Sequence, residues 1–474
     1  MLFNSLHFAV FCPIVLAIYF ALPFRFRNHW LLVASYYFYM SWNPWYGFLL
    51  FYVTATDFIA AKFIGQSKTQ FARRVWLILS LVSNLGMLFY FKYYNFFAEN
   101  ANFVLDQTGS DWQVKLIEVL LPVGISFHTF QSLSYTFDVY RRTLPVESSF
   151  WRFALYVSFF PQLVAGPIER SAHFLPQLHK YYPYDPRNFE LGSRLIIWGF
   201  FKKLVIADRL ALVVDEVYAV PSEYSSFWIL IAMYAFAMQI YCDFSGYSDI
   251  AQGIAKLMGY DLMDNFRQPY FTTNIRDFWS RWHISLSTWF RDYLYVPLGG
   301  NRKGLARQCL NLAIVFLVSG LWHGASWNFV TWGCLHGIAI VGFQLIFGGR
   351  EMGRSTLFSK LLGWFVTFHF VVIAWVFFRA DFQDSLQILS RLFDPAALQY
   401  MTTKLPQALP QLAIASLMVA LLVSLEWLSL GQRFDAMLQK RSTTTRVAIQ
   451  YLLLFCILNF GMFMQPQQFI YFQF

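Results

Sequence analysis

The chain has 474 residues, of which 57% are hydrophobic, 21% aromatic and only 13% charged, and its mean hydropathy is +0.44. Soluble domains carry about 25% charged residues, so this composition excludes an ordinary water-soluble protein. The net charge of +10 lies in short basic clusters between apolar runs. Such clusters favour orientation signals and contacts with membrane lipid over a nucleic-acid surface, so no nucleic-acid partner is expected.

Long apolar runs predict an all-α polytopic membrane protein, because about 20 apolar residues cross a bilayer core. In chain order the clearest runs are Met1–Phe24, Trp30–Thr56 (read as two crossings), Val75–Phe91, Val119–Phe137, Tyr224–Cys242, Leu361–Phe378, Leu405–Leu425 and Val447–Phe474. Shorter runs, Phe153–Ile168 and Leu195–Phe201, can cross with help from neighbouring helices. Gln308–Gly349 lacks Asp, Glu, Lys and Arg over 42 residues and provides two crossings. We expect about 11 transmembrane helices plus re-entrant or interfacial helices, in a single membrane domain covering residues 1–474.

Charge between the first runs predicts their orientation. Arg25 and Arg27 follow the first crossing, and the basic cluster Lys62–Arg74 follows the third. The loop after the fourth crossing, Glu99–Asp111, is acidic instead. Since cytoplasmic loops carry the excess of Lys and Arg, we expect Met1 outside and the basic loops in the cytoplasm.

Two histidines lie inside the long charge-free run, His323 in the block LWHGASWN and His336 in CLHG. An ionisable residue in a span is costly, so it is a functional hypothesis by default. An imidazole can serve as a general base. For one isolated histidine the commoner alternative is a neutral ring hydrogen-bonded between helices. The small residues Gly324–Ser326 favour function at His323, because they let a substrate approach closely.

A polar, aromatic stretch, Asp277–Tyr293, interrupts the apolar second half. Drawn as one helix at roughly 100° per residue, it has an aromatic face, a charged face and His283 at the edge between them. This pattern predicts an amphipathic helix half sunk in protein or in the interface. An aromatic stripe alone is more often packing than a ligand box, but an imidazole bordering it is less usual. The aromatic face holds Trp279, Trp282, Leu286, Trp289, Phe290 and Tyr293, and the charged face holds Asp277, Arg281, Arg291 and Asp292.

Two further segments carry polar groups next to apolar runs. Asp243 and Asp249 lie in the block Gln239–Asp249, at the predicted end of a span. A structural ion pair with Arg281 or Arg291 is the favoured role, and orienting a histidine or lining a polar tunnel are the alternatives. The segment Pro161–Ile168 predicts a broken helix around a cavity. His128 is interpreted as structural.

These blocks resemble the membrane-bound O-acyltransferase (MBOAT) family. The chain looks most similar to the bacterial polysaccharide O-acetylation branch, which includes the membrane subunit of alginate O-acetyltransferase and the peptidoglycan and cellulose O-acetylation proteins. The resemblance covers nearly the whole chain, and the WHG and RWHISLSTW blocks are specific. It is carried by Leu121–Arg141, Phe153–Arg170, Gln239–Ala251, Asn265–Arg302 and Gly320–Gly337, with Leu2–Ser5 and Phe469–Phe474 at the ends.

The resemblance implies a ring of helices around a thin centre, with a catalytic core at about residues 119–345. His323 matches the family's catalytic histidine, and His283 matches its second polar position, which is Asn in many eukaryotic relatives. Candidates to line the substrate tunnel are Trp322, Asn328, Asp243, Tyr247, Arg281, Trp282, Ser285, Arg291 and His336. Arg276, Arg281 or Arg302 is expected to meet the phosphates of coenzyme A. No metal site and no permanently bound cofactor are expected.

The resemblance also implies the reaction. An acetyl group would leave a cytoplasmic thioester, acetyl-CoA or an acyl carrier, and pass to a separate extracytoplasmic O-acetyltransferase of the SGNH type. That partner would acetylate a polysaccharide such as alginate, peptidoglycan or cellulose, with the chain in the bacterial inner membrane. A transporter or flippase for an envelope precursor is the main alternative, although the chain lacks the internal repeat that a transporter would predict. A noncatalytic scaffold would leave both histidines unexplained.

Overall fold

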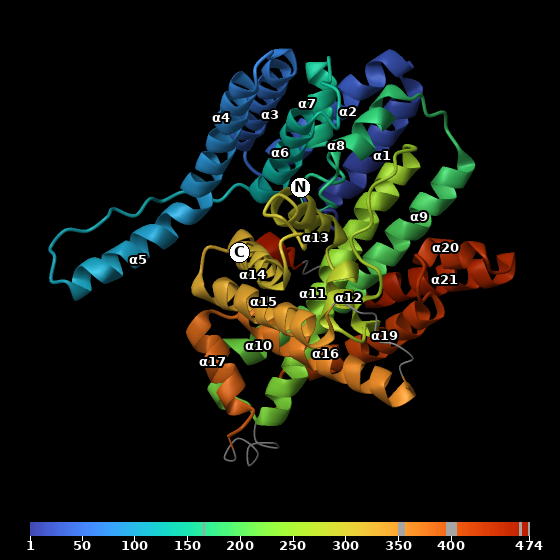
Figure 1. The fold of residues 1–474 in the computed structure, drawn as a ribbon. Helices are drawn as coiled ribbons and strands as arrows, with labels where there is room; N and C mark the ends of the chain where they lie inside the picture. The colour runs from blue at the N-terminus through green and yellow to red at the C-terminus, as the bar shows by residue number, and fades with distance from the viewer. Residues whose placement is uncertain (165, 349–355, 395–404, 464–466, 473–474) are drawn as a thin grey trace. The chain divides into compact units, whose positions relative to one another are not determined.

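A computed structural model describes residues 1–164, 166–348, 356–394, 405–463 and 467–472 of the chain (Figure 1). All regular secondary structure within these residues is helical, which confirms the all-α prediction. The chain forms two compact units. The first comprises Met1–Phe189 and Ala255–Met263, and the second comprises Glu190–Ile254 and Asp264–Phe474.

The first unit is built on three helices that share one buried carboxylate. Asp57 of α3 is fully buried and accepts hydrogen bonds from the hydroxyls of Ser80 and Ser132 and from the amide of Asn84, the last at 2.9 Å. These donors tie α3 to α4 and α6, since a carboxylate inside a span must be satisfied by protein groups. The helices of this unit are α1 (Leu6–Ala21), α2 (Phe24–Met40), α3 (Trp45–Gln66), α4 (Gln70–Leu88), α5 (Tyr94–Gln107), α6 (Ile125–Arg141), α7 (Phe150–Ser158) and α8 (Ser171–Phe174).

The predicted span Val119–Phe137 is wrong at its start, because α6 begins only at Ile125. Pro122 and Gly124, which has a φ of +74°, keep the preceding backbone out of a helix. The segment before them runs extended along α5, where the side-chain amide of Asn95 pairs with the backbone of Ile117, and Asn102 pairs in the same way with Val114. His128 lies fully buried in α6, 6.2 Å from the ring of Tyr39.

The second unit begins with one long, bulged helix. α9 (Pro186–Phe200) continues through a π-helical turn, Phe201–Ala207, into α10 (Asp208–Ala219). The unit also holds most of α11 (Ser226–Leu257), and then α12 (Ile275–Arg281), α13 (Ile284–Phe290), α14 (Leu305–His323), α15 (Trp327–Phe347), α16 (Leu357–Arg379), α17 (Phe382–Arg391), α19 (Leu409–Leu428), α20 (Phe434–Gln439) and α21 (Thr443–Phe460).

Two glycines bring α14 and α15 into backbone contact. A Cβ atom on Gly320 would lie 2.3 Å from the carbonyl oxygen of Phe329, and one on Gly333 would lie 2.6 Å from that of Phe316. Small residues at a crossing let membrane helices approach closely. α16 packs on the other side of α15, so the three helices lie side by side (Figure 1).

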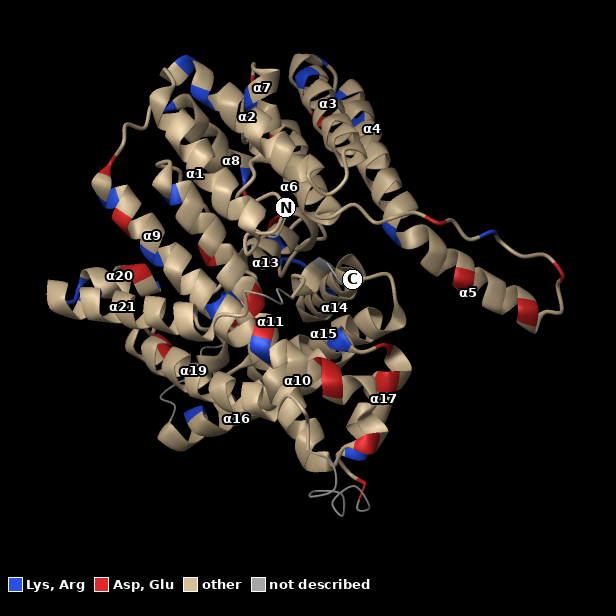
Figure 2. Ribbon diagram, turned by 180° about the vertical axis from the view of Figure 1, so that it is seen from behind, with Lys and Arg blue, Asp and Glu red and all other residues tan. Residues whose placement is uncertain are grey.

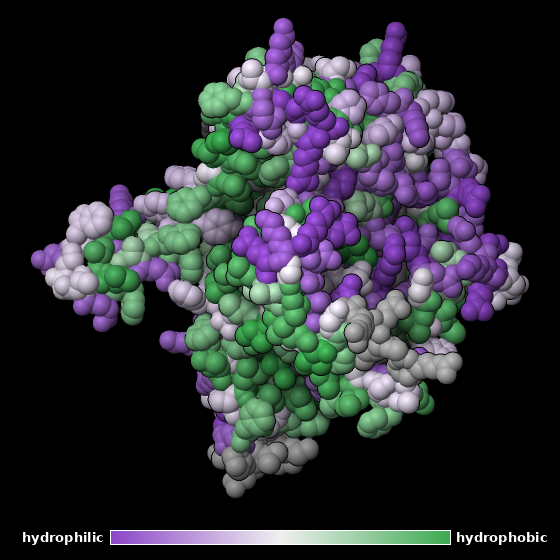
Figure 3. Space-filling model, viewed as in Figure 1, coloured by the Kyte–Doolittle hydropathy of each residue, from purple (hydrophilic) through white to green (hydrophobic). Residues whose placement is uncertain are grey.

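Eight described helices are long and apolar enough to cross a membrane: α3, the continuous α4–α5 helix, α11, α14, α15, α16, α19 and α21. The predicted number of 11 is not confirmed, and α1 and α2 have only 16 and 17 residues. Along α3 and α4 the Lys and Arg residues gather at one end (Figure 2). On the face seen in Figure 3, hydrophobic side chains gather over α15, where Ile338 and Ile346 are more than 70% exposed. Such a surface suits lipid as its solvent.

Several predicted spans differ from the helices. The run Trp30–Thr56 does break into α2 and α3, and Gln308–Gly349 gives α14 and α15, with Gly349 outside the described residues. Phe153–Ile168 is no crossing, because α7 stops at Ser158 and the following Pro-rich segment is irregular, with residue 165 outside the description. Leu195–Phe201 is an inner part of the α9–α10 helix.

The last predicted run also differs. Val447–Phe474 is helical only to Phe460, and residues 464–466 and 473–474 lie outside the described residues. The span predicted to stop at Cys242 continues to Leu257, so Asp243 and Asp249 lie inside α11.

The geometry of α4 supports a topology test. α4 has 19 residues, about 28 Å at 1.5 Å per residue, which matches a hydrocarbon core of about 30 Å. Reporter fusions placed after Arg74 and after Asp106 should therefore report opposite sides of the membrane. A matching signal from both positions would contradict the crossing and the outside position of Met1.

Candidate active site

His323 is the last residue of α14, where the helix meets a tight turn. Gly324 adopts an extended conformation, and a Cβ atom there would lie 2.1 Å from the ring of Phe329, so only glycine fits. The imidazole is 6% exposed. The C-terminal position holds the ring at the end of a rigid helix, which favours accurate placement.

His283 is placed by a different device, and the predicted continuous helix over Asp277–Tyr293 is wrong. The chain breaks at His283, whose φ of +44° and ψ of 54° are left-handed, a conformation that His tolerates better than most residues. Asn265 holds this turn: its carbonyl accepts from the Ile284 amide at 2.9 Å, and its side chain accepts from the Ser285 hydroxyl at 2.6 Å. Burial lowers the pKa of His283 to about 3, so its imidazole is neutral at physiological pH.

Two aromatic rings each lie close to both His283 and His323. The ring centroid of Trp322 lies 4.9 Å from that of His323 and 6.1 Å from that of His283. Tyr471 lies 5.7 Å from His323 and 6.3 Å from His283. The structure therefore brings the two predicted catalytic residues to the same pair of rings.

A cavity of about 770 Å³ lies against α14 and α15 and reaches Ser319, four residues before His323. On α14 its lining residues recur three or four apart, a spacing that puts them on one face, and His323 is the next position of that stripe. On α15 the stripe from Gln344 and Ile340 continues in the same way to His336 and Trp332. The lining includes Arg276, Trp279, Ser280, Ser287, Arg291, Asn301, Gln308, Leu312, Phe316, Ser319, Ile340 and Gln344.

Trp279 lines this cavity, and its ring contacts that of His336. The indole Nε1 of Trp279 donates a hydrogen bond to Nδ1 of His336 at 3.3 Å. Because an indole N–H can only donate, a neutral His336 carries its proton on Nε2. Trp332 lies between Trp279 and His323, with its ring centroid 5.7 Å from that of Trp279 and 4.9 Å from that of His323.

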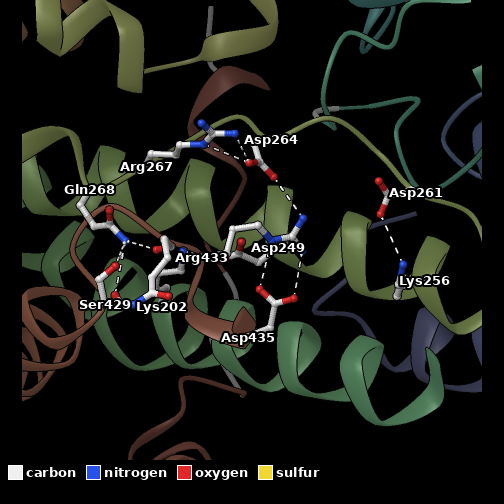
Figure 4. Close-up of polar contacts among 11 residues, drawn as sticks. Lys202, Asp249, Lys256, Asp261, Asp264, Arg267, Gln268, Ser429, Arg433 and Asp435 are labelled. Atoms are coloured by element: carbon white, nitrogen blue, oxygen red, sulfur yellow. Dashed lines mark hydrogen bonds and ion pairs between the residues drawn. The ribbon is translucent and has the colours of Figure 1, made fainter. Parts of the chain in front are cut away.

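Asp243 and Asp249 do form ion pairs, as predicted, but their partners are lysines, so the predicted pairing with Arg281 or Arg291 is wrong. Lys203 Nζ lies 2.6 Å from Asp243 and 2.8 Å from Asp208, and Lys202 pairs with Asp249. Lys202 and Asp249 are drawn in Figure 4, and both line a small pocket of about 40 Å³. The two lysines of the π-helical turn thus contact α11 directly. Arg281 instead pairs with Asp277 at 3.1 Å, and Arg291 with Asp292 at 2.8 Å.

Comparison with known proteins decides the family. A model of the membrane-bound O-acyltransferase family (MBOAT) matches residues 141–382, a range that holds both histidines. The probable alginate O-acetylase AlgI of Pseudomonas aeruginosa is 39% identical over 450 residues, covering 93% of this chain and 84% of that protein. The chain belongs to the membrane-bound O-acyltransferase family. It is an acyltransferase and a multi-pass membrane protein, which decides against the transporter alternative.

Two other relatives differ in how similar their sequences are to this chain. The peptidoglycan O-acetyltransferase of Helicobacter pylori is 36% identical over 426 residues, covering 82% of this chain and 79% of that protein. The teichoic acid D-alanyltransferase of Bacillus subtilis is 26% identical over 268 residues, covering 54% of this chain and 68% of that protein. This acyltransferase is therefore more similar to the P. aeruginosa and H. pylori proteins than to that D-alanyltransferase.

The other predicted tunnel residues of this acyltransferase have local partners. Asn328 donates to the carbonyl of Phe377 at 3.1 Å, which ties the start of α15 to α16. Trp282 packs 4.8 Å from Trp375, and Tyr247 packs 5.0 Å from Phe469. Of the two arginines predicted to line the tunnel, Arg291 lines the cavity and Arg281 does not.

Sequence reasoning missed several residues of this site. Lys202 and Lys203 stand inside the apolar run GFFKKLVIA, and Glu426 stands just beyond the predicted span Leu405–Leu425, so the cost of burying charge in a membrane would have singled them out. Glu426 is buried and accepts a hydrogen bond from the hydroxyl of Tyr241. Asn265 and Tyr471 gave no signal of their own, because their roles depend on contacts distant in sequence.

The ion pairs predict a large loss of stability when a buried cation is removed. Lys203→Met leaves two carboxylates buried without their ammonium partner, and breaking such a pair costs about 3–5 kcal/mol. The matched control is Lys256→Met. The ammonium of Lys256 lies 3.5 Å from the carboxylate of Asp261, which is exposed, and such a surface pair is worth about 0–1 kcal/mol. Thermal unfolding in detergent should show a clearly lower Tm for the first variant alone. Equal Tm values would refute a stabilising role for the Lys203 cluster.

Proposed function

We propose that this acyltransferase takes an acetyl group from a cytoplasmic thioester, acetyl-CoA in the simplest case, and passes it across the membrane for O-acetylation of a polysaccharide. The observation that carries the proposal is the cavity along α14 and α15, whose lining stripe on α14 runs to Ser319, with His323 the next position on that helix face. A thioester in this cavity would have its long, polar part among Arg276, Arg291 and Gln308. Its acyl end would point toward the imidazole.

His323 would act as a general base. Its imidazole takes the proton from an acceptor hydroxyl, and the hydroxyl oxygen attacks the carbonyl carbon of the thioester. The carbon–sulfur bond then breaks, and the thiolate leaves with the proton returned by the imidazolium. The enclosure of His323 by aromatic rings excludes water, which protects the thioester from hydrolysis.

His283 would stabilise the negative charge on the carbonyl oxygen. Because its imidazole is neutral, one ring nitrogen carries a proton and can donate a hydrogen bond to the developing oxyanion. The indole N–H of Trp322 is a second donor at the same place. Asn265 would keep the His283 imidazole in a fixed position, because its hydrogen bonds hold the left-handed turn.

The acceptor is proposed from the names of the relatives, which act on alginate and peptidoglycan. We assign this chain to the inner membrane of a bacterium, with a separate extracytoplasmic O-acetyltransferase of the SGNH type as its partner. That partner would receive the acetyl group and transfer it to the glycan.

Removal of the general base tests the mechanism. His323→Ala and His323→Gln should lower acetyl transfer by about 10²–10⁴-fold, the usual contribution of a general base. His29→Ala serves as the control, because His29 is exposed in α2. Transfer is measured in membranes that contain the acceptor, with Tm measured beside it. Wild-type turnover in a folded His323→Ala protein would refute the mechanism.

The cavity lining tests the donor. Arg276→Gln should raise the KM for acetyl-CoA about tenfold, since one charge-assisted hydrogen bond to a phosphate is worth about 1.5–3 kcal/mol. Arg281→Gln is the matched control, because Arg281 pairs with Asp277 and does not line the cavity. An unchanged KM in both variants, with transfer dependent on an added acyl carrier protein, would point to a carrier-bound donor.

A further inference from the structure

Four aromatic rings enclose the imidazole of His323. Trp322 and Trp332 each lie 4.9 Å from it between ring centroids, Phe378 lies at 5.1 Å and Tyr471 at 5.7 Å. We name these four residues the aromatic box. Centroid separations of about 4.5–7 Å are those of rings in contact, so the box is closely packed around His323.

Phe378 is a member of the box whose ring is itself packed against three other aromatic rings. It is fully buried, and its ring lies 5.1 Å from Phe329, 5.3 Å from Trp332 and 5.2 Å from Trp375. The preceding carbonyl, that of Phe377, accepts the hydrogen bond from Asn328. The ring therefore cannot turn aside without disturbing α15 and α16.

We propose that Phe378 is a specificity-determining residue, which restricts the acyl group transferred at His323 to acetyl. The inference rests on the proposed function. A thioester whose carbonyl reaches the hydroxyl activated by His323 has its acyl substituent against the aromatic box. A methyl group displaces little there, whereas each added methylene must push back a ring that three others support. Discrimination by one methylene in an apolar pocket amounts to about 10–200-fold.

The test compares thioesters of two lengths on the full chain in membranes that contain the acceptor. Phe378→Ala opens the space of a phenyl ring next to His323, so the ratio of kcat/KM for butyryl-CoA over acetyl-CoA should rise at least about tenfold. Phe378→Leu keeps more of the volume and should give a smaller rise in the same direction. The matched control is Phe358→Ala, at a lipid-facing position of α16 that is 74% exposed, where the ratio should stay at the wild-type value.

Each result decides a separate claim. A wild type that uses acetyl-CoA, together with folded Phe378→Ala and Phe378→Leu proteins that reject butyryl-CoA as strongly, would overturn the role of Phe378 and leave the proposed function standing. If Phe378→Ala fails to fold, Phe378→Leu decides alone: a higher ratio of kcat/KM for butyryl-CoA over acetyl-CoA supports the role of Phe378, and an unchanged ratio overturns it. A wild type that uses neither thioester would overturn acetyl-CoA as the donor in the proposed function, and this inference with it.

Discussion

The buried ammonium of Lys203 is the interaction on which the second unit depends most. Lys203 projects from the π-helical turn and joins Asp208 of α10, Asp243 of α11 and the carbonyl of Gln467 at 3.2 Å. Asp243 in turn accepts from the backbone amide of Ile470 at 2.8 Å. A charge taken out of water must be satisfied by its neighbours, so these partners cannot move independently. The same cluster thus fixes the helices and the C-terminal segment that carries Tyr471 to the histidines.

The two histidines owe their positions to opposite local rules. His323 ends a regular helix, and Gly324 turns the chain because no side chain fits beside Phe329. His283 interrupts helical structure with a left-handed residue that Asn265 supports. Both rings are then surrounded by aromatic side chains, and burial keeps the imidazole of His283 neutral. A neutral ring can both accept and donate a proton, as acyl transfer requires.

The sequence was sufficient for what depends on composition and local spacing. Apolar runs predicted many of the helices, and the charge-free run Gln308–Gly349 predicted the pair α14 and α15. Helical periodicity failed at His283, because the left-handed turn is held by Asn265, 18 residues earlier, and no local pattern reveals that contact. Ion pairing failed at Asp243 for the same reason, since its partner Lys203 lies 40 residues away. Tyr471 reaches the site only through the folded position of the C-terminal segment.

The contact between Gly320 and Gly333 has a consequence for the lipid around the enzyme. A membrane helix longer or shorter than the local bilayer responds by tilting. Because these glycines lock the backbones of α14 and α15 together one turn from His323, the two helices must tilt as one body. Changes in bilayer thickness then alter the angle of the pair and leave the spacing of His323 and Trp332 intact. The chemistry is in this way insulated from lipid composition, and the same catalytic geometry serves membranes of different thickness.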